Sequence, residues 1–237
     1  MSVSFIIPAH NEEHLLPTCL QSIFSEIKRT ELQHTEVIVV DNGSTDHTAD
    51  MARAFGATVI SCAEKGLTKA KQAGHNAATN QFEAYIDADN ILPTGWLTTA
   101  LKAFNDPAVV GASGPLVFYD LPEWHRKLTR VWYGIADPLN SLMGRWLQGG
   151  NYIVRKRAID KIGGYDTSID FYGEDTAIAK RLSRVGKIKF LPGLRILSSG
   201  RRLEHQGIFN TGMHYALNYF SVTLFGKPVT KSHEDYR

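Results

Sequence analysis

Short apolar runs alternate with longer amphipathic segments in the amino-terminal part of the chain, and this order restricts the fold more than any other feature of the sequence. The short runs are rich in β-branched residues, whereas apolar residues in the segments between them recur every three or four positions. This β-α-β-α-β-α-β order predicts an α/β fold with a doubly wound, mostly parallel sheet and helices on both faces. The expected strands are 3–7, 37–40, 57–61 and 82–86, and the expected helices are 15–27, a segment ending at Gly56, and 68–79.

The rest of the chain is less regular. No repeat or linker-like tract divides it from the first part, so we expect the 237 residues to form one domain, 1–237. Helical and extended patterns still alternate, which predicts a further region added to the same sheet. The expected helices are 96–104, 124–147 with an interruption at 137–138, 155–162 and 174–185, and the expected extended segments are 109–118, 152–154 and, as the last strand, 188–191.

Charge divides the chain into two halves. Residues 1–118 carry 7 Lys and Arg against 13 Asp and Glu, and residues 119–237 carry 19 against 11, although the whole chain has a net charge of +2. We therefore expect different partners for the halves, and no nucleic acid, because no basic low-complexity tail is present. The two cysteines, Cys19 and Cys62, lie in unrelated segments, and the start of the chain lacks a signal-peptide pattern, which favours a cytoplasmic protein.

The uncharged stretch 205–226 has apolar residues at helical spacing. It carries too many polar residues to predict a segment that crosses a membrane. Two interpretations remain: an amphipathic helix packed on the domain, which we favour, or a helix lying at a membrane surface. The apolar positions are Phe209, Met213, Leu217, Phe220 and Leu224.

Carboxylates follow the expected strands. Asp41 comes after the second strand, and Asp87 and Asp89 come after the fourth. The carboxyl ends of parallel strands meet at one edge, where α/β folds bind ligands. No Gly-rich dinucleotide turn or Gly-Lys-Ser/Thr loop is present, so an Asp-x-Asp pair that holds Mg²⁺ or Mn²⁺ against a diphosphate is the favoured site. Taken singly, the Asp-x-Asp could be a solvated turn, and Asp41 a helix-capping residue.

Further motifs follow in an order that is more specific than any one of them. They are IPAHNEE at 7–13, VVDNGSTDHT at 39–48, AKQAG at 70–74, YIDADN at 85–90, GGN at 149–151, IGGYD at 162–166 and YGEDT at 172–176. In this order and spacing, the chain resembles the family 2 glycosyltransferases with the GT-A fold, over roughly residues 3–200.

The resemblance implies a GT-A fold with a Rossmann-like sheet, a nucleotide-sugar donor half at 1–118 and an acceptor half at 119–237. It implies a hexosyltransferase-type enzyme that uses Mg²⁺ or Mn²⁺ to move a sugar from a UDP- or GDP-sugar to an acceptor hydroxyl. Lys71 stands where the family usually has Arg, and would neutralise a phosphate as a point charge without the bidentate fork. Nucleoside contacts would fall on Pro8, Ala9, Glu12 and Asp41, and metal contacts on Asp87, which could instead contact ribose, and on Asp89.

Asp175 is the candidate base for the acceptor hydroxyl, with Glu174 beside it. Both open an expected helix, whose dipole favours an ionised carboxylate, and in the resembled family this Glu-Asp pair faces the acceptor. A single displacement with one base inverts the anomeric centre. The residues alone also fit a simpler role at the helix amino terminus, and they do not separate inversion from retention.

Residues 198–205 lie where related enzymes have a mobile loop over the donor diphosphate. Arg201 and Arg202 would pair there with phosphate oxygens, and His205 would supply a third metal ligand. The alternatives are a solvated basic loop and a structural histidine.

A basic aromatic segment of the second half is the candidate contact for an acceptor. It could stack on sugars or rest on lipid headgroups, or pack as a core helix with snorkelling cations. The acceptor would then be a saccharide or lipid-linked, and the protein a peripheral enzyme at the inner face of the membrane. Rival readings are a nucleotidyltransferase and a non-catalytic sugar-binding relative. The segment contains Trp124, Arg126, Lys127, Arg130, Trp132, Tyr133, Arg145 and Trp146.

Overall fold

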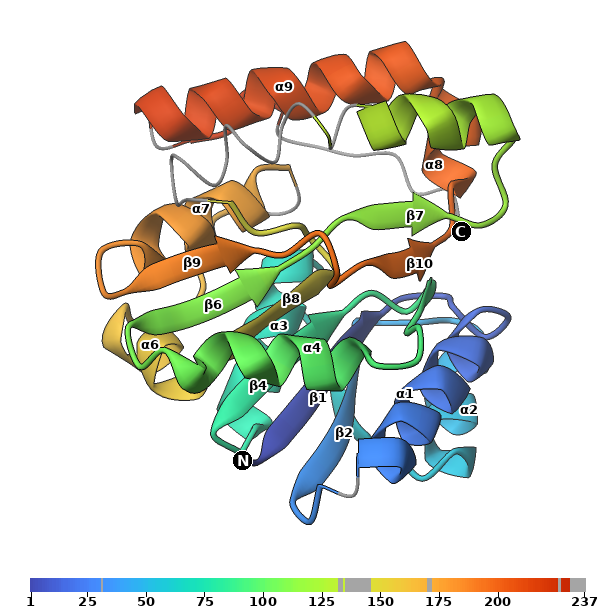
Figure 1. Ribbon diagram of the computed structural model, residues 1–237. Coiled ribbons are helices and arrows are strands. Elements are labelled where there is room, and N and C mark those ends of the chain that lie inside the picture. Colours follow the sequence, from blue (N-terminus) through green and yellow to red (C-terminus); the bar gives the residue numbers. More distant parts are fainter. Residues whose placement is uncertain (31, 132–133, 135–145, 170–171, 226, 231–237) are drawn as a thin grey trace.

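The protein is built on a seven-stranded sheet with the strand order β3-β2-β1-β4-β8-β6-β9 (Figure 1). The computed structural model describes the chain except for residues 31, 132–133, 135–145, 170–171, 226 and 231–237. The predicted mostly parallel sheet is confirmed. Only β8 runs against its two neighbours. The strands are β1 Val3–Ala9, β2 Thr35–Asp41, β3 Thr58–Ser61, β4 Phe82–Ile86, β6 Val109–Ser113, β8 Asn151–Arg155 and β9 Lys187–Phe190.

Helices cover both faces of the sheet. Successive side chains of β1 point to opposite faces, and each face packs against helices to form its own core. Phe5 and Ile7 belong to the core that includes α1 and α4, whereas Ile6 belongs to the core that includes α3, α6 and α7. The α3 backbone lies close to the sheet, since a Cβ on Gly74 would lie 2.4 Å from Ile6 Cγ2. The helices are α1 Leu16–Thr30, α2 Thr48–Ala54, α3 Leu67–Ala77, α4 Trp96–Lys102, continued by the 3₁₀ turn η1 Ala103–Asn105, α6 Lys156–Lys161 and α7 Glu174–Leu182.

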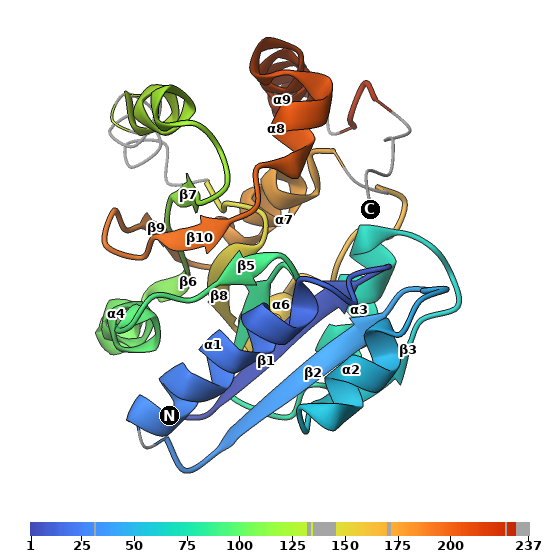
Figure 2. The same cartoon turned by 90° about the vertical axis from the view of Figure 1, so that its right-hand side faces the viewer.

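A second sheet of three short strands, in the order β5-β10-β7, lies between the main sheet and the end of the molecule that carries the carboxyl-terminal helices (Figures 1 and 2). The strand β10 shows that 188–191 is not the last strand, and a helix, α8, replaces most of the loop expected at 198–205. The expected extended segment 109–118 contains β7, but β5 and β10 were not predicted, because strands of two or three residues are too short to produce a hydrophobic period. Their bounds are β5 Asn90–Ile91, β7 Leu116–Phe118, β10 Ile196–Ser198 and α8 Arg201–Gln206.

The expected carboxyl-terminal helix is present as α9, Ile208–Phe225. One face packs on the domain through Thr211, Asn218 and Val222, which are buried. Met213 and Phe220 of the predicted apolar stripe are exposed, as is Leu217, so the expectation that this stripe packs on the domain is wrong for these three side chains. None of the described helices is long and apolar enough to cross a membrane. The side chains of Phe209 and Leu224 lie outside what the structure describes, as do residues 137–138.

Candidate active site

The carboxyl ends of β1 and β2 meet at one edge of the sheet. Ala9 pairs in register with Asp41, and the Asn42 amide donates to the Ala9 carbonyl at 2.8 Å. Asp41 Oδ1 accepts from the Ser44 amide at 3.0 Å, a contact within the turn; the N-cap residue of α2 is His47, so Asp41 does not cap that helix. The role of Asp41 in holding a nucleoside stays a prediction, as does that of Pro8, which lies one residue before Ala9 in β1.

The loops that follow β1 and β2 are tied to each other. Asn11 adopts a left-handed backbone with φ 52, and its Oδ1 accepts from the Thr45 amide at 2.8 Å. The next amide, of Glu12, donates to Thr48 Oγ1 at 2.7 Å. These bonds fix the Glu12 side chain beside the strand ends.

Glu12 and Asp89 share one partner, although they follow different strands. The Arg201 guanidinium, at the start of α8, donates to Glu12 Oε1, and its Nη2 lies 3.5 Å from Asp89 Oδ2. Glu12 is buried, and Arg201 and Asp89 are partly exposed. Arg201, which was expected to bind the diphosphate, therefore contacts Asp89, which was expected to bind the metal.

Gly149 and Gly150 lie between Asp87 and the pair Glu174 and Asp175. Gly150 has φ +71, and a Cβ there would lie 2.1 Å from Asp87 Oδ2. A Cβ on Gly149 would lie 3.5 Å from Glu174 Oε1 and 3.6 Å from Asp175 Oδ2. The predicted donor and base carboxylates thus flank one Gly-Gly segment, which passes between them because it has no side chains.

Glu174 is buried at the start of α7, and Asp175 beside it is half-buried. Burial raises the pKa of Glu174 to about 7, although the Lys71 ammonium, which donates to Glu174 Oε1 at 2.6 Å, opposes the rise. Burial also raises the pKa of Asp175 above its ordinary value, and the Thr176 amide, which donates to Asp175 Oδ1 at 2.7 Å, opposes it. Two carboxyl groups with raised pKa values, side by side, are the arrangement expected of an acid-base site. The role of Lys71 as a phosphate ligand stays a prediction, and it requires this ion pair to open.

The carboxylates fit a hard divalent cation by their chemistry. Asp87 and Asp89 offer oxygen ligands, and Mg²⁺ is commonly held by one or two carboxylates plus substrate phosphates. Within the part of the chain that the structure describes, no three His, Cys, Asp or Glu side chains cluster as a complete metal site. His205 is exposed on α8, so its predicted role as a third ligand would need a rearrangement of this region.

Arg202 contacts a different group from its neighbour. Its Nη1 donates to the Tyr215 hydroxyl of α9 at 2.9 Å, and the ring of Tyr215 lies edge-on to Tyr172 at 5.6 Å. The predicted contact of Arg202 with phosphate remains a prediction.

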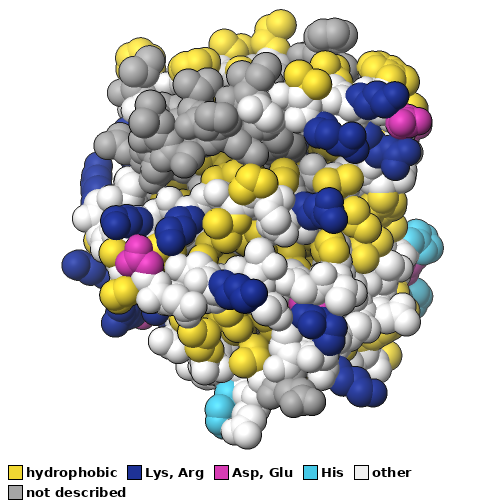
Figure 3. Space-filling view, viewed as in Figure 1, with side chains coloured by type: hydrophobic (Ala, Val, Ile, Leu, Met, Phe, Trp, Pro, Cys, Tyr) yellow, Lys and Arg dark blue, Asp and Glu magenta, His cyan; other side chains and the backbone are white. Residues whose placement is uncertain are grey.

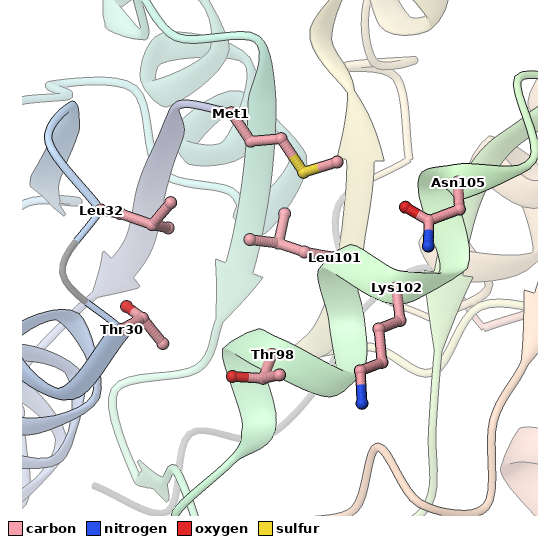
Figure 4. A pocket seen from close by; sticks show the side chains of 7 residues that line it. All are labelled: Met1, Thr30, Leu32, Thr98, Leu101, Lys102 and Asn105. Carbon is pink, nitrogen blue, oxygen red and sulfur yellow. The ribbon is translucent and has the colours of Figure 1, made fainter.

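A hollow of about 270 Å³ lies at the other end of the strands (Figure 4). Met1, which precedes β1, contributes to its wall, and among the described lining residues Lys102 has the one charged side chain. The hollow therefore lacks the groups that the strand ends provide. Its lining residues are Met1, Thr30, Leu32, Thr98, Leu101, Lys102 and Asn105.

Residues 4–163 match the family model described as Glycosyl transferase family 2, which covers more than half of the chain. The chain belongs to glycosyltransferase family 2. Among curated proteins, this family 2 member is 37% identical over 94 residues to the uncharacterized glycosyltransferase Rv0539 of Mycobacterium tuberculosis, covering 40% of this chain and 39% of that protein. It is 29% identical over 216 residues to the probable glycosyltransferase YdaM of Bacillus subtilis, covering 80% of this chain and 49% of the other. The chain therefore spans less than half the length of these two relatives.

Solved structures place the family 2 member in the GT-A fold. A mannosyltransferase from Pyrobaculum calidifontis, in complex with GDP-Man and Mn²⁺, superposes with a TM-score of 0.76 at 21% identity, over 94% of this chain and 64% of that one. Glucosyl-3-phosphoglycerate synthase from Mycobacterium tuberculosis, in complex with Mn²⁺ and UDP-Glc, gives 0.65 at 20% identity, over 97% and 80%. Identities this low establish the fold alone, and with it the predicted fold class is confirmed.

Three relationships in this site were not predicted from the sequence: the Lys71–Glu174 pair, the Glu12–Arg201 pair, and the passage of Gly149-Gly150 between carboxylates. The GGN motif held a signal for the third, because adjacent glycines before a strand indicate that the backbone comes close to another group. The two ion pairs join residues more than a hundred positions apart, and no local pattern marks them.

Proposed function

We propose that the protein transfers a sugar from a UDP- or GDP-sugar to an acceptor hydroxyl. The observation that carries the proposal is the Gly149-Gly150 segment, which brings Asp87 close to Glu174 and Asp175. A donor bound at the strand ends would thus have its transferable sugar near these carboxyl groups. The nucleotide sugars and Mn²⁺ in the two structural neighbours support this assignment.

Asp89 and Asp87 would hold Mg²⁺ or Mn²⁺, which would neutralise the charge that grows on the leaving diphosphate. The chain's own groups around it are the Glu12 carboxylate and the Arg201 guanidinium. Arg201 and Arg202 would supply positive charge for the phosphate oxygens, whereas Lys71 stays paired with Glu174. The nucleoside would lie along Pro8, Ala9 and Asp41, at the ends of β1 and β2.

Asp175 would take the proton from the acceptor hydroxyl as that oxygen attacks the sugar's anomeric carbon. Asp175 is half-buried, so an acceptor can reach it, and the Thr176 amide orients Oδ1. Glu174 stays on Lys71 and holds the start of α7 in place. One base and one displacement give inversion, so the product anomer should be opposite to that of the donor.

A thermal-shift screen of UDP-, GDP- and dTDP-sugars with and without Mn²⁺ tests this function. One donor should raise the melting temperature only with the metal present. If no nucleotide sugar shifts it, donor binding is wrong. If a donor binds but is neither transferred nor hydrolysed, the chain is a non-catalytic sugar-binding relative.

We also propose that the acceptor half meets an anionic membrane surface, where a lipid-linked acceptor would be presented. The helix at 123–131 and α9 lie at the same end of the molecule (Figures 1 and 2). On α9, Met213, Leu217 and Phe220 are 61%, 52% and 61% exposed. Figure 3 shows hydrophobic side chains along the upper edge, over α9, and Lys and Arg side chains together with an acidic side chain at the upper right, over the helix at 123–131.

The helix at 123–131 carries a second stripe of the same kind. Trp124, Leu128 and Val131, spaced like one face of a helix, are 59%, 44% and 59% exposed. The same helix contains Arg126, Lys127 and Arg130 against one acidic residue, Glu123. Apolar stripes beside basic side chains suit a surface of anionic lipid. Trp132, Tyr133 and Arg145 of the predicted segment lie outside the described residues, and the Trp146 ring contacts Tyr219.

Co-sedimentation with vesicles tests the membrane proposal. The protein should pellet with vesicles that contain phosphatidylglycerol and not with neutral phosphatidylcholine, and salt should weaken binding. Leu128→Glu combined with Leu217→Glu should abolish pelleting, whereas Lys161→Glu, on the distant helix α6, should not. Equal pelleting of the double variant would contradict the proposal.

A further inference from the structure

Arg201 is a positive charge placed against two carboxylates that come from distant parts of the chain. Glu12 lies in the loop before α1, Asp89 follows β4, and Arg201 opens α8. The Glu12 carboxylate is 4% exposed. A buried carboxylate is strongly destabilising unless a cation compensates its charge, and Arg201 supplies that cation here.

The start of α8 is held independently of this contact. Asp120 accepts from the Ser199 hydroxyl at 2.5 Å and from the Gly200 amide at 2.6 Å. A Cβ on Gly200 would lie 2.2 Å from Leu121 Cγ, so the backbone packs tightly at this point. The helix start is therefore fixed, while the Arg201 side chain, on a long flexible stem, is free to turn without moving it.

We propose that Arg201 is the resident counter-ion of Glu12 and Asp89, and that a divalent cation arriving with the donor displaces it. The inference rests on the proposed function. A divalent cation on Asp89 and a guanidinium 3.5 Å from the same carboxylate repel each other, so the two cations compete. Once displaced, the guanidinium turns to the diphosphate oxygens. Their negative charge replaces that of Asp89, which the divalent cation then neutralises.

This exchange makes two predictions of opposite sign for one residue. Arg201→Gln should bind Mn²⁺ alone about fivefold more tightly or better, because the competing charge is gone. The same variant should bind the Mn²⁺ complex of the nucleoside diphosphate more weakly, because it has lost a charge-assisted contact. A residue with only a structural role would not tighten metal binding.

Electron paramagnetic resonance of free Mn²⁺, titrated into the full chain without nucleotide, gives the first affinity, and calorimetry with UDP or GDP gives the second. Arg53→Gln is the control. It removes the same charge from the surface of α2, where Arg53 contacts Asp50, and should leave Mn²⁺ affinity within about twofold of the parent. Arg201→Lys retains the positive charge and should also stay close to the parent.

Unchanged or weaker Mn²⁺ binding by Arg201→Gln, or no Mn²⁺ binding by either protein, overturns the exchange. Equal tightening by Arg53→Gln also overturns it, because the net charge of the protein then explains the effect. If Arg201→Gln does not fold, Arg201→Ala combined with Glu12→Gln, which removes the buried charge too, should still bind Mn²⁺ more tightly than Glu12→Gln alone. Failure of the proposed function gives a different result, because the parent protein would then bind neither UDP nor GDP in the presence of Mn²⁺.

Discussion

The Lys71 ammonium donates a hydrogen bond of 2.6 Å to Glu174 Oε1, and the two side chains are 1% and 5% exposed. Lys71 belongs to α3 and Glu174 opens α7, so the pair ties α3 to the helix that carries Asp175. The ammonium also lies 5.2 Å from the centre of the Tyr152 ring. The position of the candidate base therefore depends on an ion pair between α3 and α7.

Removing one member of this pair should destabilise the protein strongly. Lys71→Met leaves Glu174 buried without its cation and should lower the free energy of unfolding by about 3–5 kcal/mol. Lys71→Met combined with Glu174→Met removes both charges and should recover most of the loss. Urea unfolding followed by circular dichroism measures both. A double variant no more stable than Lys71→Met would contradict this account of the pair.

The raised pKa of Glu174 predicts a pH dependence of stability. The folded-state pKa of about 7 lies above the ordinary value of 4.5, so the folded protein holds this proton more tightly and its contribution to stability is lost as the pH rises through 7. Between pH 5 and 8 the parent should lose about 2 kcal/mol relative to Glu174→Gln, which does not ionise there. Unfolding free energies of both proteins across this range measure the difference. Parallel curves would place the Glu174 pKa near its ordinary value.

Asp175→Asn should abolish transfer while leaving donor binding intact. Loss of a general base costs about 10²–10⁴-fold in rate, and the amide keeps the size of the side chain. Because burial raises the pKa of Asp175, the acidic limb of kcat/KM should lie above pH 4, where an ordinary Asp would put it. Asp50→Asn, on the surface of α2, is the control. Turnover at the parent's rate by Asp175→Asn would remove Asp175 from the mechanism.

Gly150→Ala should damage the donor site. The backbone there has φ +71, and a Cβ would lie 2.1 Å from Asp87 Oδ2, so strain and displacement of Asp87 add together. Gly56→Ala, at φ +84 with nothing within 4 Å, measures strain alone, about 1 kcal/mol. Gly149→Ala meets its neighbours at ordinary contact distance and should be mild. Donor affinity and unfolding of the three variants separate the effects, and equal losses for Gly150→Ala and Gly56→Ala would exclude the contact with Asp87.

Asp89→Ala should remove the metal dependence of donor binding. The parent should bind its donor more tightly with Mn²⁺ than with chelator, because the cation bridges carboxylate and diphosphate. The variant should show one weak affinity in both conditions by calorimetry. A Mn²⁺ effect as large as the parent's would exclude Asp89 as a metal ligand.

Much of the amino-terminal half could be predicted because its signals are local. The strand β4 at 82–86 has the expected bounds, and β1 and β2 extend the expected runs by a few residues. Beyond β8 the prediction was weaker. The strand β10 exists only by pairing with β5 and β7, and α8 lies where a loop was expected. Short elements of this kind depend on distant partners rather than on their own pattern.

The sequence alone determined the order of strands and helices as far as β4, because the hydrophobic spacing of each of these segments is local, and it therefore placed Asp41, Asp87 and Asp89 at strand ends. Only the tertiary structure decided which charges meet. Lys71 and Glu174 are 103 residues apart, and Arg201 and Glu12 are 189 apart. A buried charge must find a partner wherever the packed chain brings one near. The folded chain, rather than any motif, thus assigned Lys71 to Glu174 and Arg201 to Glu12.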